Sequence, residues 1–124
     1  MSADLASAFP RTGTRVRLDL PDGGRGMILR LADGSRVGEF AVVEDGGALA
    51  IDVLCIDEPA RGYGLGSEAA CLLRDACAEH SRGRVRAWAP PDRGLAVYFW
   101  SRMGFHPVFG ERPGGGIWFE RGVR

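Results

Sequence analysis

The sequence predicts a mixed α/β (α+β) fold, in which a mostly antiparallel sheet of about six to seven strands carries two main helices. Two observations support this prediction: four strand-like runs precede residue 57, and a run with helical periodicity starts at residue 65. The chain has 124 residues, of which 45% are hydrophobic and 26% charged, which suits one hydrophobic core. We therefore expect a single domain over residues 1–124, with residues 1–11 as an N-terminal arm.

The first half of the chain predicts four strands. Residues 15–20 alternate polar and apolar side chains, as in a half-buried strand, and Pro21 to Gly24 should end that strand. Residues 27–31 and 36–43 form the next two, joined through an Asp-Gly turn. The fourth, residues 48–56, is almost continuously apolar, so both of its faces should be covered, with Asp52 as its only charge.

The second half predicts two helices and three strands. A helix starts at Leu65 and should stop by Gly83. After a strand at residues 84–89, Asp92 is a good N-cap for a second helix that Gly104 closes. Residues 105–109 and 117–121 read as the last two strands. We expect the final strand, with Trp118 and Phe119, to be an edge strand able to pair across a dimer axis.

Composition excludes several classes of function. The 16 basic side chains, all arginine, balance 16 acidic ones, so no net field favours nucleic acid or an anionic membrane. The absence of lysine excludes Schiff-base chemistry. The three cysteines and two histidines have no zinc-like spacing, which predicts no metal site. No signal peptide or membrane-length apolar run is visible, so we expect a cytoplasmic protein with no membrane partner.

Residues 57–67, Asp-Glu-Pro-Ala-Arg-Gly-Tyr-Gly-Leu-Gly-Ser, join the apolar fourth strand directly to the first helix. Backbone N–H groups at a helix start have no partner within the helix and attract anions. Gly62, Gly64 and Gly66 would let a phosphate approach the backbone, while Arg61 and Ser67 add a guanidinium and a hydroxyl. A turn that binds nothing and a loop that binds ATP or another nucleotide both remain open on these residues.

The same stretch resembles the acyl-CoA loop of the GNAT superfamily of N-acyltransferases. Its pattern, Arg/Gln-x-x-Gly-x-Gly/Ala, is filled by Arg61, Gly64 and Gly66. Residues 96–105 are similar to the helix-to-strand segment that commonly ends in Gly-Phe in this family. The order of elements from residue 36 onward also matches.

The resemblance implies that acetyl-CoA is the co-substrate and that the reaction needs no metal. It further implies that a primary amine of a small molecule, protein or peptide attacks the thioester of acetyl-CoA directly. The amides of residues 62–67 would bind the pyrophosphate. The family's two splayed strands, here residues 48–56 and 84–89, would admit the pantetheine arm. The residues thereby assigned to the cofactor are Leu54, Cys55, Ile56, Arg61, Gly62, Tyr63, Gly64, Leu65, Gly66, Ser67 and Trp100.

The chain departs from the family in its catalytic residues. Trp100 replaces the tyrosine that often protonates the leaving thiolate, and an indole is no acid at neutral pH. Trp88 stands where some members have a glutamate base. The remaining candidate catalytic residues are Asp52, Glu39 and Tyr98, and transfer by proximity is also plausible. The alternative function is a CoA- or acyl-CoA-binding regulatory or interaction module that has lost catalysis.

The chain is also short for the family. Only residues 21–26 separate the first two strands, where the family usually inserts two helices that wall the acceptor site. The acceptor site is therefore expected to be open, or to be completed by a second copy of the chain or by a partner protein.

Overall fold

A computed structural model describes residues 7–22, 25–45, 48–62, 64–80, 84–89, 99–108 and 116–122. Its strands are β1 (Arg11–Thr12), β2 (Val16–Asp22), β3 (Arg25–Arg30), β4 (Arg36–Asp45), β5 (Ala48–Ile56), β6 (Arg84–Ala89), β7 (His106–Val108) and β8 (Ile117–Gly122). They form one sheet in the order β1-β2-β3-β4-β5-β6-β8-β7. β5 and β6 pair in parallel, and the other described pairings are antiparallel. The predicted fold class is confirmed, with eight strands in place of six to seven.

β2 and β3 form a hairpin in which Asp22 pairs with Arg25. There is accordingly no room between these strands for a helix pair, as the sequence predicts. β2 does not end before Pro21, however. The register shifts between Asp19 and Asp22, and such an irregularity lets a strand pass through a proline that cannot donate to the ladder.

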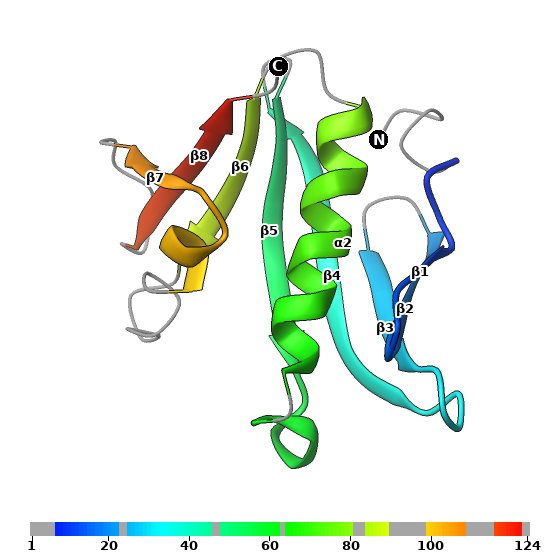
Figure 1. The fold of residues 1–124 in the computed structure, drawn as a ribbon. Helices are drawn as coiled ribbons and strands as arrows, with labels where there is room; N and C mark the ends of the chain where they lie inside the picture. Colours follow the sequence, from blue (N-terminus) through cyan, green and yellow to red (C-terminus); the bar gives the residue numbers. More distant parts are fainter. Residues whose placement is uncertain are drawn as a thin grey trace.

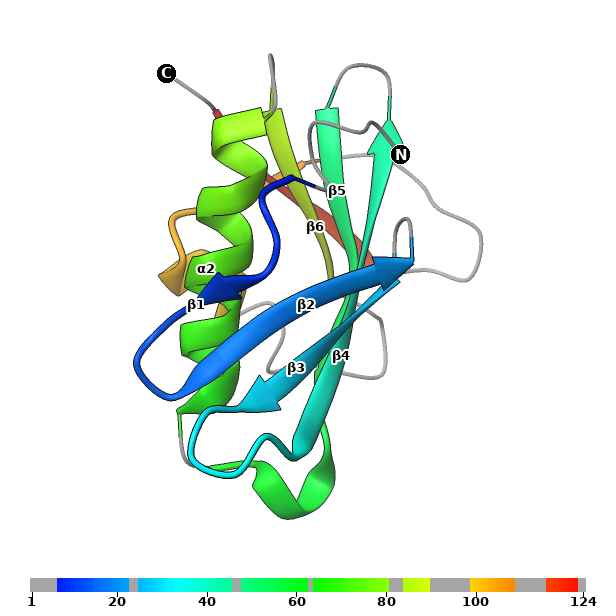
Figure 2. The ribbon, with the colours of Figure 1, turned by 90° about the vertical axis from the view of Figure 1, so that its right-hand side faces the viewer.

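Helix α2 (Leu65–His80) connects the two parallel strands and covers one face of the sheet (Figures 1 and 2). Its buried stripe is rich in small residues, which lets the helix approach the strands closely. The buried members are Leu65, Ala69, Ala70, Leu73, Ala76 and Cys77. Two hydrogen bonds of 2.8 Å between Arg11 and Glu79 hold β1 against the far end of α2. Among the described helices, none is long and apolar enough to cross a membrane.

Part of the second predicted helix is present. Residues 99–102 are helical, whereas Asp92 and the other predicted positions up to Tyr98 lie outside the described residues. The segment packs against α2, because the sulfur atoms of Cys71 and Met103 lie 3.5 Å apart. Arg74 also donates a hydrogen bond of 3.4 Å to the Met103 carbonyl.

The expectation that the last strand is an edge strand is wrong. β8 lies between β6 and β7, and the side chain of Phe119 is completely buried in the core. The edges of the sheet are β1 and β7. Strand 117–121 is therefore not available to pair across a dimer axis, because both of its neighbours belong to the same chain.

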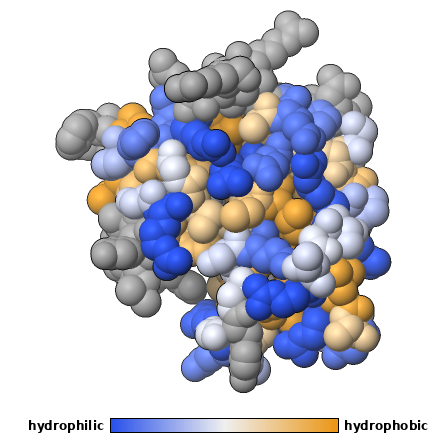
Figure 3. Space-filling model, in the orientation of Figure 1, coloured by the Kyte–Doolittle hydropathy of each residue, from blue (hydrophilic) through white to orange (hydrophobic). Residues whose placement is uncertain are grey.

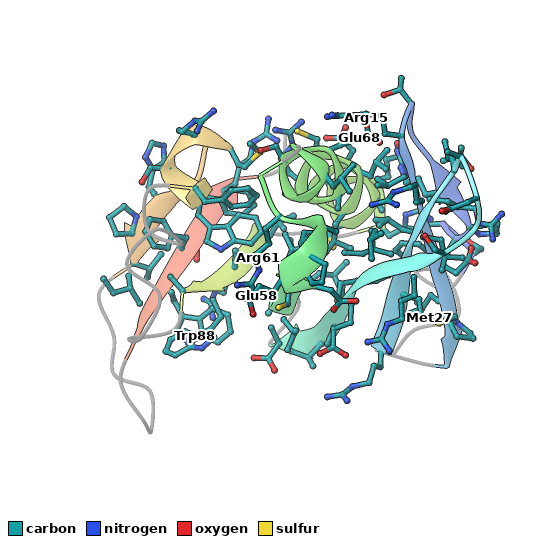
Figure 4. All side chains as sticks on the ribbon, turned by 90° about the horizontal axis from the view of Figure 1, so that it is seen from below. Arg15, Met27, Glu58, Arg61, Glu68 and Trp88 are labelled. Carbon is teal, nitrogen blue, oxygen red and sulfur yellow. The ribbon has the colours of Figure 1, made fainter. Side chains whose placement is uncertain are left out.

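The described α-helical segments lie on one face of the sheet. Viewed from below, α2 and residues 99–102 are on one side, whereas Met27 and Trp88 point to the other (Figure 4). Directly paired residues share a face. Glu39, paired with Met27, and Trp118, paired with Trp88, therefore lie on this second face, which is termed the open face.

Candidate functional site

β5 and β6 separate partway along their length. Their parallel pairing ends at Ile51 and Ala87, although β5 continues to Ile56 and β6 to Ala89. Figure 1 shows the two strands diverging toward the N-terminal end of α2. The region beyond the Ile51–Ala87 pair is termed the splay. A strand edge that leaves its neighbour offers backbone N–H and C=O groups to an extended ligand, as the resemblance predicts for the pantetheine arm.

A bulge in β5 marks the start of the splay. Ala41 of β4 pairs with Val53, but the next residue, Val42, pairs with Ile51. Asp52 is thus the additional residue of β5 at this point in the ladder. Bulges re-aim side chains and interrupt regular pairing, and they are common beside active sites.

The predicted burial of β5 on both faces is correct only for its first part. Residues 49–51 are buried, whereas residues 52–56 are all half-buried. The reason is the splay, because β6 no longer covers the edge of β5 after Ile51. Asp52 is accordingly not enclosed in the core.

The glycine-rich turn follows β5 through a short 3₁₀ helix, η1 (Glu58–Ala60). Gly62 and Gly64 have φ values of +89° and +77°, a backbone conformation that side chains with a Cβ rarely adopt. The Gly64 carbonyl accepts the first hydrogen bond of α2, from the Glu68 N–H at 3.2 Å. The N–H groups of residues 65–67, which include Gly66 and Ser67, therefore have no acceptor within the helix.

The start of α2 lies directly over the end of β5. A Cβ added to Gly66 would be 3.3 Å from Cγ1 of Ile56. The predicted phosphate-binding amides and the splayed edge of β5 are thereby brought together. Tyr63, the remaining predicted residue of the turn, lies outside the described residues.

Arg61 has a different environment from the one the sequence suggests. Its Nε donates a hydrogen bond of 2.8 Å to the carbonyl of Ile56, and its Nη2 lies 3.8 Å from Sγ of Cys55. Figure 4 shows Arg61 between the start of α2 and the strands. Its guanidinium therefore holds the end of β5 against the turn, whereas the sequence suggested only a role toward phosphate.

Arg15 is a residue that sequence reasoning missed. Its Nη2 donates a hydrogen bond of 3.3 Å to the Gly64 carbonyl, and its Nε lies 3.6 Å from a carboxylate oxygen of Glu68. The side chain is 53% exposed. It adds a positive charge to the helix start from the bend before β2, far away in the sequence, and no local pattern signals that placement.

Glu68 anchors the start of β2 to the first turn of α2. Its carboxylate accepts hydrogen bonds from the Thr14 hydroxyl at 2.6 Å and from the N–H groups of Arg15 and Val16 at 2.8 and 2.7 Å. Burial alone would raise the pKa of Glu68. The three hydrogen bonds and the charge of Arg15 outweigh burial and hold this pKa below its usual value.

Leu54, Cys55 and Ile56 are half-buried along the splayed part of β5. Leu54 and Ile56 pack against the core on the helix side, as do Phe99 and Met103. Figure 3 shows the helix-covered face, with apolar side chains gathered between α2 and the segment that contains residues 99–103. An apolar strip next to a strand edge that β6 no longer pairs with suits a ligand with both methylene and amide groups.

The catalytic candidates lie on different strands. Glu39 is opposite Cys55 in the ladder of β4 and β5, and its carboxylate forms an ion pair of 3.4 Å with Arg36. Asp52 occupies the bulge, two positions before Leu54. Tyr98 lies outside the described residues. Asp52 and Glu39 thus both lie at the splay, and within the described ranges no three His, Cys, Asp or Glu side chains gather to hold a metal ion.

Trp100 is a core residue, only 3% exposed. Its ring packs edge-on against Phe99 and Phe105, with centroids 5.1 Å apart in both cases. Its backbone carbonyl accepts a hydrogen bond of 3.1 Å from the Phe105 N–H, which closes the helical segment. This aromatic packing explains a tryptophan at the position without any catalytic role.

No protein-family model and no curated protein matches the chain. Solved structures, however, do match the chain. Ard1 from Thermoplasma volcanium is 20% identical, with a TM-score of 0.66 over 82% of this chain and 71% of that one. Naa50 from Arabidopsis thaliana, in complex with the bisubstrate analogue CoA-Ac-MVNAL, is 18% identical, with a TM-score of 0.62 over 78% and 71%. A GNAT-family acetyltransferase from Staphylococcus aureus is 16% identical, with a TM-score of 0.66 over 81% and 68%.

Proposed function

We propose that this chain, which has the fold of the GNAT acetyltransferases, transfers an acetyl group from acetyl-CoA to a primary amine. One observation carries the proposal. The parallel pairing of β5 with β6 stops at Ile51 and Ala87, and the part of β5 beyond that pairing leads directly into a glycine-rich turn at the start of α2. An extended arm that ends in phosphates fits such an arrangement.

The residues present fit coenzyme A in two respects. The N–H groups of residues 65–67 and the positive end of α2 suit the pyrophosphate, and Arg15 adds a guanidinium beside them. The half-buried side chains of Leu54 and Cys55 suit the pantetheine arm. Arg61 would act as a positioning residue, because it bonds to the Ile56 carbonyl and so sets where β5 ends.

The transfer itself needs little from the protein beyond placement. The amine lone pair forms a bond to the thioester carbonyl carbon, the bond from carbon to sulfur breaks, and its electron pair leaves with the thiolate. One proton must leave the amine and one must reach the thiolate. Asp52 and Glu39 are the carboxylates at the splay that would accept the first, directly or through water.

A specific observation favours the second candidate function, acyl-CoA binding without transfer. Trp100 stands where the family often has its acid, and it is enclosed by Phe99 and Phe105. A thiolate leaving group needs only weak assistance, however, and proximity alone supplies a large part of the rate in such reactions. Transfer is therefore the function that we propose.

The test is release of free CoA, followed with a thiol reagent in the presence of acetyl-CoA and single amines. Amine-dependent release supports transfer, whereas binding of acetyl-CoA without any amine-dependent release supports the binding module. Asp52→Asn and Glu39→Gln, compared with each other, identify the base. The variant that lacks it should lose rate at neutral pH and recover part of the rate at alkaline pH, where more of the amine is already deprotonated.

A further inference from the structure

The open face of the sheet carries a pair of half-buried tryptophans. Trp88 of β6 and Trp118 of β8 are directly paired, with ring centroids 5.2 Å apart and planes inclined at 55°. Val108 of β7 is the next partner across the sheet from Trp118. These three side chains are termed the tryptophan surface. Figure 4 shows Trp88 on the side of the sheet away from α2.

The tryptophan surface borders the splay. Trp88 directly follows Ala87, the last residue of β6 that pairs with β5, and Asp52 directly follows Ile51, the last residue of β5 that pairs with β6. The opening between the strands therefore has an indole at its β6 side and a carboxylate at its β5 side. Glu39, opposite Cys55 of β5, is a further carboxylate, and it lies on the open face.

The position of the Trp88 ring is tightly constrained. A Cβ added to Gly116 would overlap the outer edge of this ring, so the indole lies against the bare backbone of the residue before β8. Gly116 has a φ of +91°. With Trp118 on its other flank, the Trp88 ring is held in place before any ligand arrives, which lowers the entropic cost of stacking.

Two carboxylates of the described part of this face are in ion pairs with arginine. Glu120 forms an ion pair of 3.1 Å with Arg86, and Glu39 forms one of 3.4 Å with Arg36. A polycation such as a polyamine would also meet the positive charge of these two arginines. The charge pattern therefore favours a ligand with a single amine and a broad apolar group.

We propose that the acceptor is a primary amine borne by an aromatic ring or a comparably broad apolar group. Its ring stacks on the tryptophan surface, and its amine points across the splay toward Asp52. The inference rests on the proposed function, because it names the acceptor of that transfer. Aromatic rings gain from stacking in offset or edge-on geometry with other rings, and the two inclined indoles offer both.

The first test compares kcat/KM for phenethylamine, n-butylamine and spermidine, measured as release of CoA from acetyl-CoA. We expect phenethylamine to exceed each of the others by about fivefold or more, in line with the usual strength of aromatic stacking. Trp118→Leu should reduce that ratio toward one, whereas Trp118→Phe should retain most of it. Ile117→Ala is the matched control, because Ile117 is on the same strand, 40% exposed, and faces the opposite side. A ratio near one for the wild-type protein, or a preference for spermidine, would overturn the proposal.

The second test does not depend on turnover. Phenethylamine is titrated into the CoA-saturated protein while tryptophan emission is followed with excitation at the red edge of indole absorption. The chain has three tryptophans, and Trp100 is buried, so a saturable change reports on Trp88 and Trp118. The change should be absent for n-butylamine and reduced in Trp118→Leu, with thermal melts to verify folding. Saturable quenching without CoA release would refute transfer but retain the aromatic site, whereas release without quenching would refute the aromatic site alone.

Discussion

Comparing the variants Gly62→Glu and Gly34→Glu distinguishes a loss of phosphate binding from the loss of stability that follows when any glycine with positive φ is replaced. Both glycines have positive φ, +89° and +73°, and a Cβ at either would meet no atom of the described residues within 4 Å. A side chain in this conformation costs about 1–2 kcal/mol. Both variants should therefore unfold at a similarly lowered temperature, roughly 3–10 °C below the wild type.

Only one of the two variants should lose the binding of acetyl-CoA. Acetyl-CoA at about 100 times its Kd should stabilise the wild type by about 2.7 kcal/mol. Gly34→Glu, in the turn between β3 and β4, should keep this gain. Gly62→Glu should lose it, because the new carboxylate would face the phosphates. The assay is a melting curve over a series of acetyl-CoA concentrations. An equal ligand-dependent rise in the two variants would show that the reasoning about the glycine-rich turn is wrong.

Three further predictions concern stability. Glu68→Gln should lower the free energy of unfolding by about 1.5–3 kcal/mol at pH 7. Because the folded-state pKa of Glu68 is held below 4.5, the difference in unfolding free energy between the variant and the wild type should shrink as pH falls through 4.5 and below. Denaturant titrations at several pH values measure this difference, and a constant value would contradict the lowered pKa. Trp100→Ala should cost about 3–5 kcal/mol in the same assay, since it empties a core position, and a cost below 1 kcal/mol would place the indole outside the core. Gly116→Ala should lower the free energy of unfolding by about 1–3 kcal/mol and shift the tryptophan emission, because the added Cβ would move the Trp88 ring. An unchanged emission spectrum would argue against the close contact between Gly116 and that ring.

Periodicity and turn chemistry were sufficient to predict the fold class and most of the strands, but not the order of all the strands in the sheet. The alternation in residues 15–20, the Asp-Gly turn before β4 and the apolar stripe from Leu65 each correspond to an element of the structure. β1 was missed because two residues are too few to show a period. The internal position of β8 was missed because strand order depends on which edge of β6 the chain returns to, and no local pattern in residues 117–121 encodes that choice.

The site was predictable to the extent that it depends on consecutive residues. The turn from Arg61 to Ser67 contains its own glycines and helix start, so its location at the start of α2 could be inferred from spacing, whereas phosphate binding there stays a prediction. Side-chain partners cannot be inferred in this way. Arg15 reaches the turn from the bend before β2. Arg61 bonds to the Ile56 carbonyl because the turn after β5 brings its side chain back beside the end of that strand.

The tryptophan surface illustrates the same limit. Trp88 and Trp118 are thirty residues apart in the sequence and become neighbours only through the pairing of β6 with β8. The sequence marked Trp88 only as a departure from a family pattern. The structure gives it a defined contact with Gly116 and a position beside the splay.

The central claim is that acyl-CoA binds along the splayed edge of β5. A calorimetric titration of the protein with acetyl-CoA tests this claim most directly. The account predicts saturable binding with one molecule per chain, competition by free CoA, and no competition by ATP at the same concentration. Absence of binding, or ATP binding that displaces acetyl-CoA equally well, would contradict the claim.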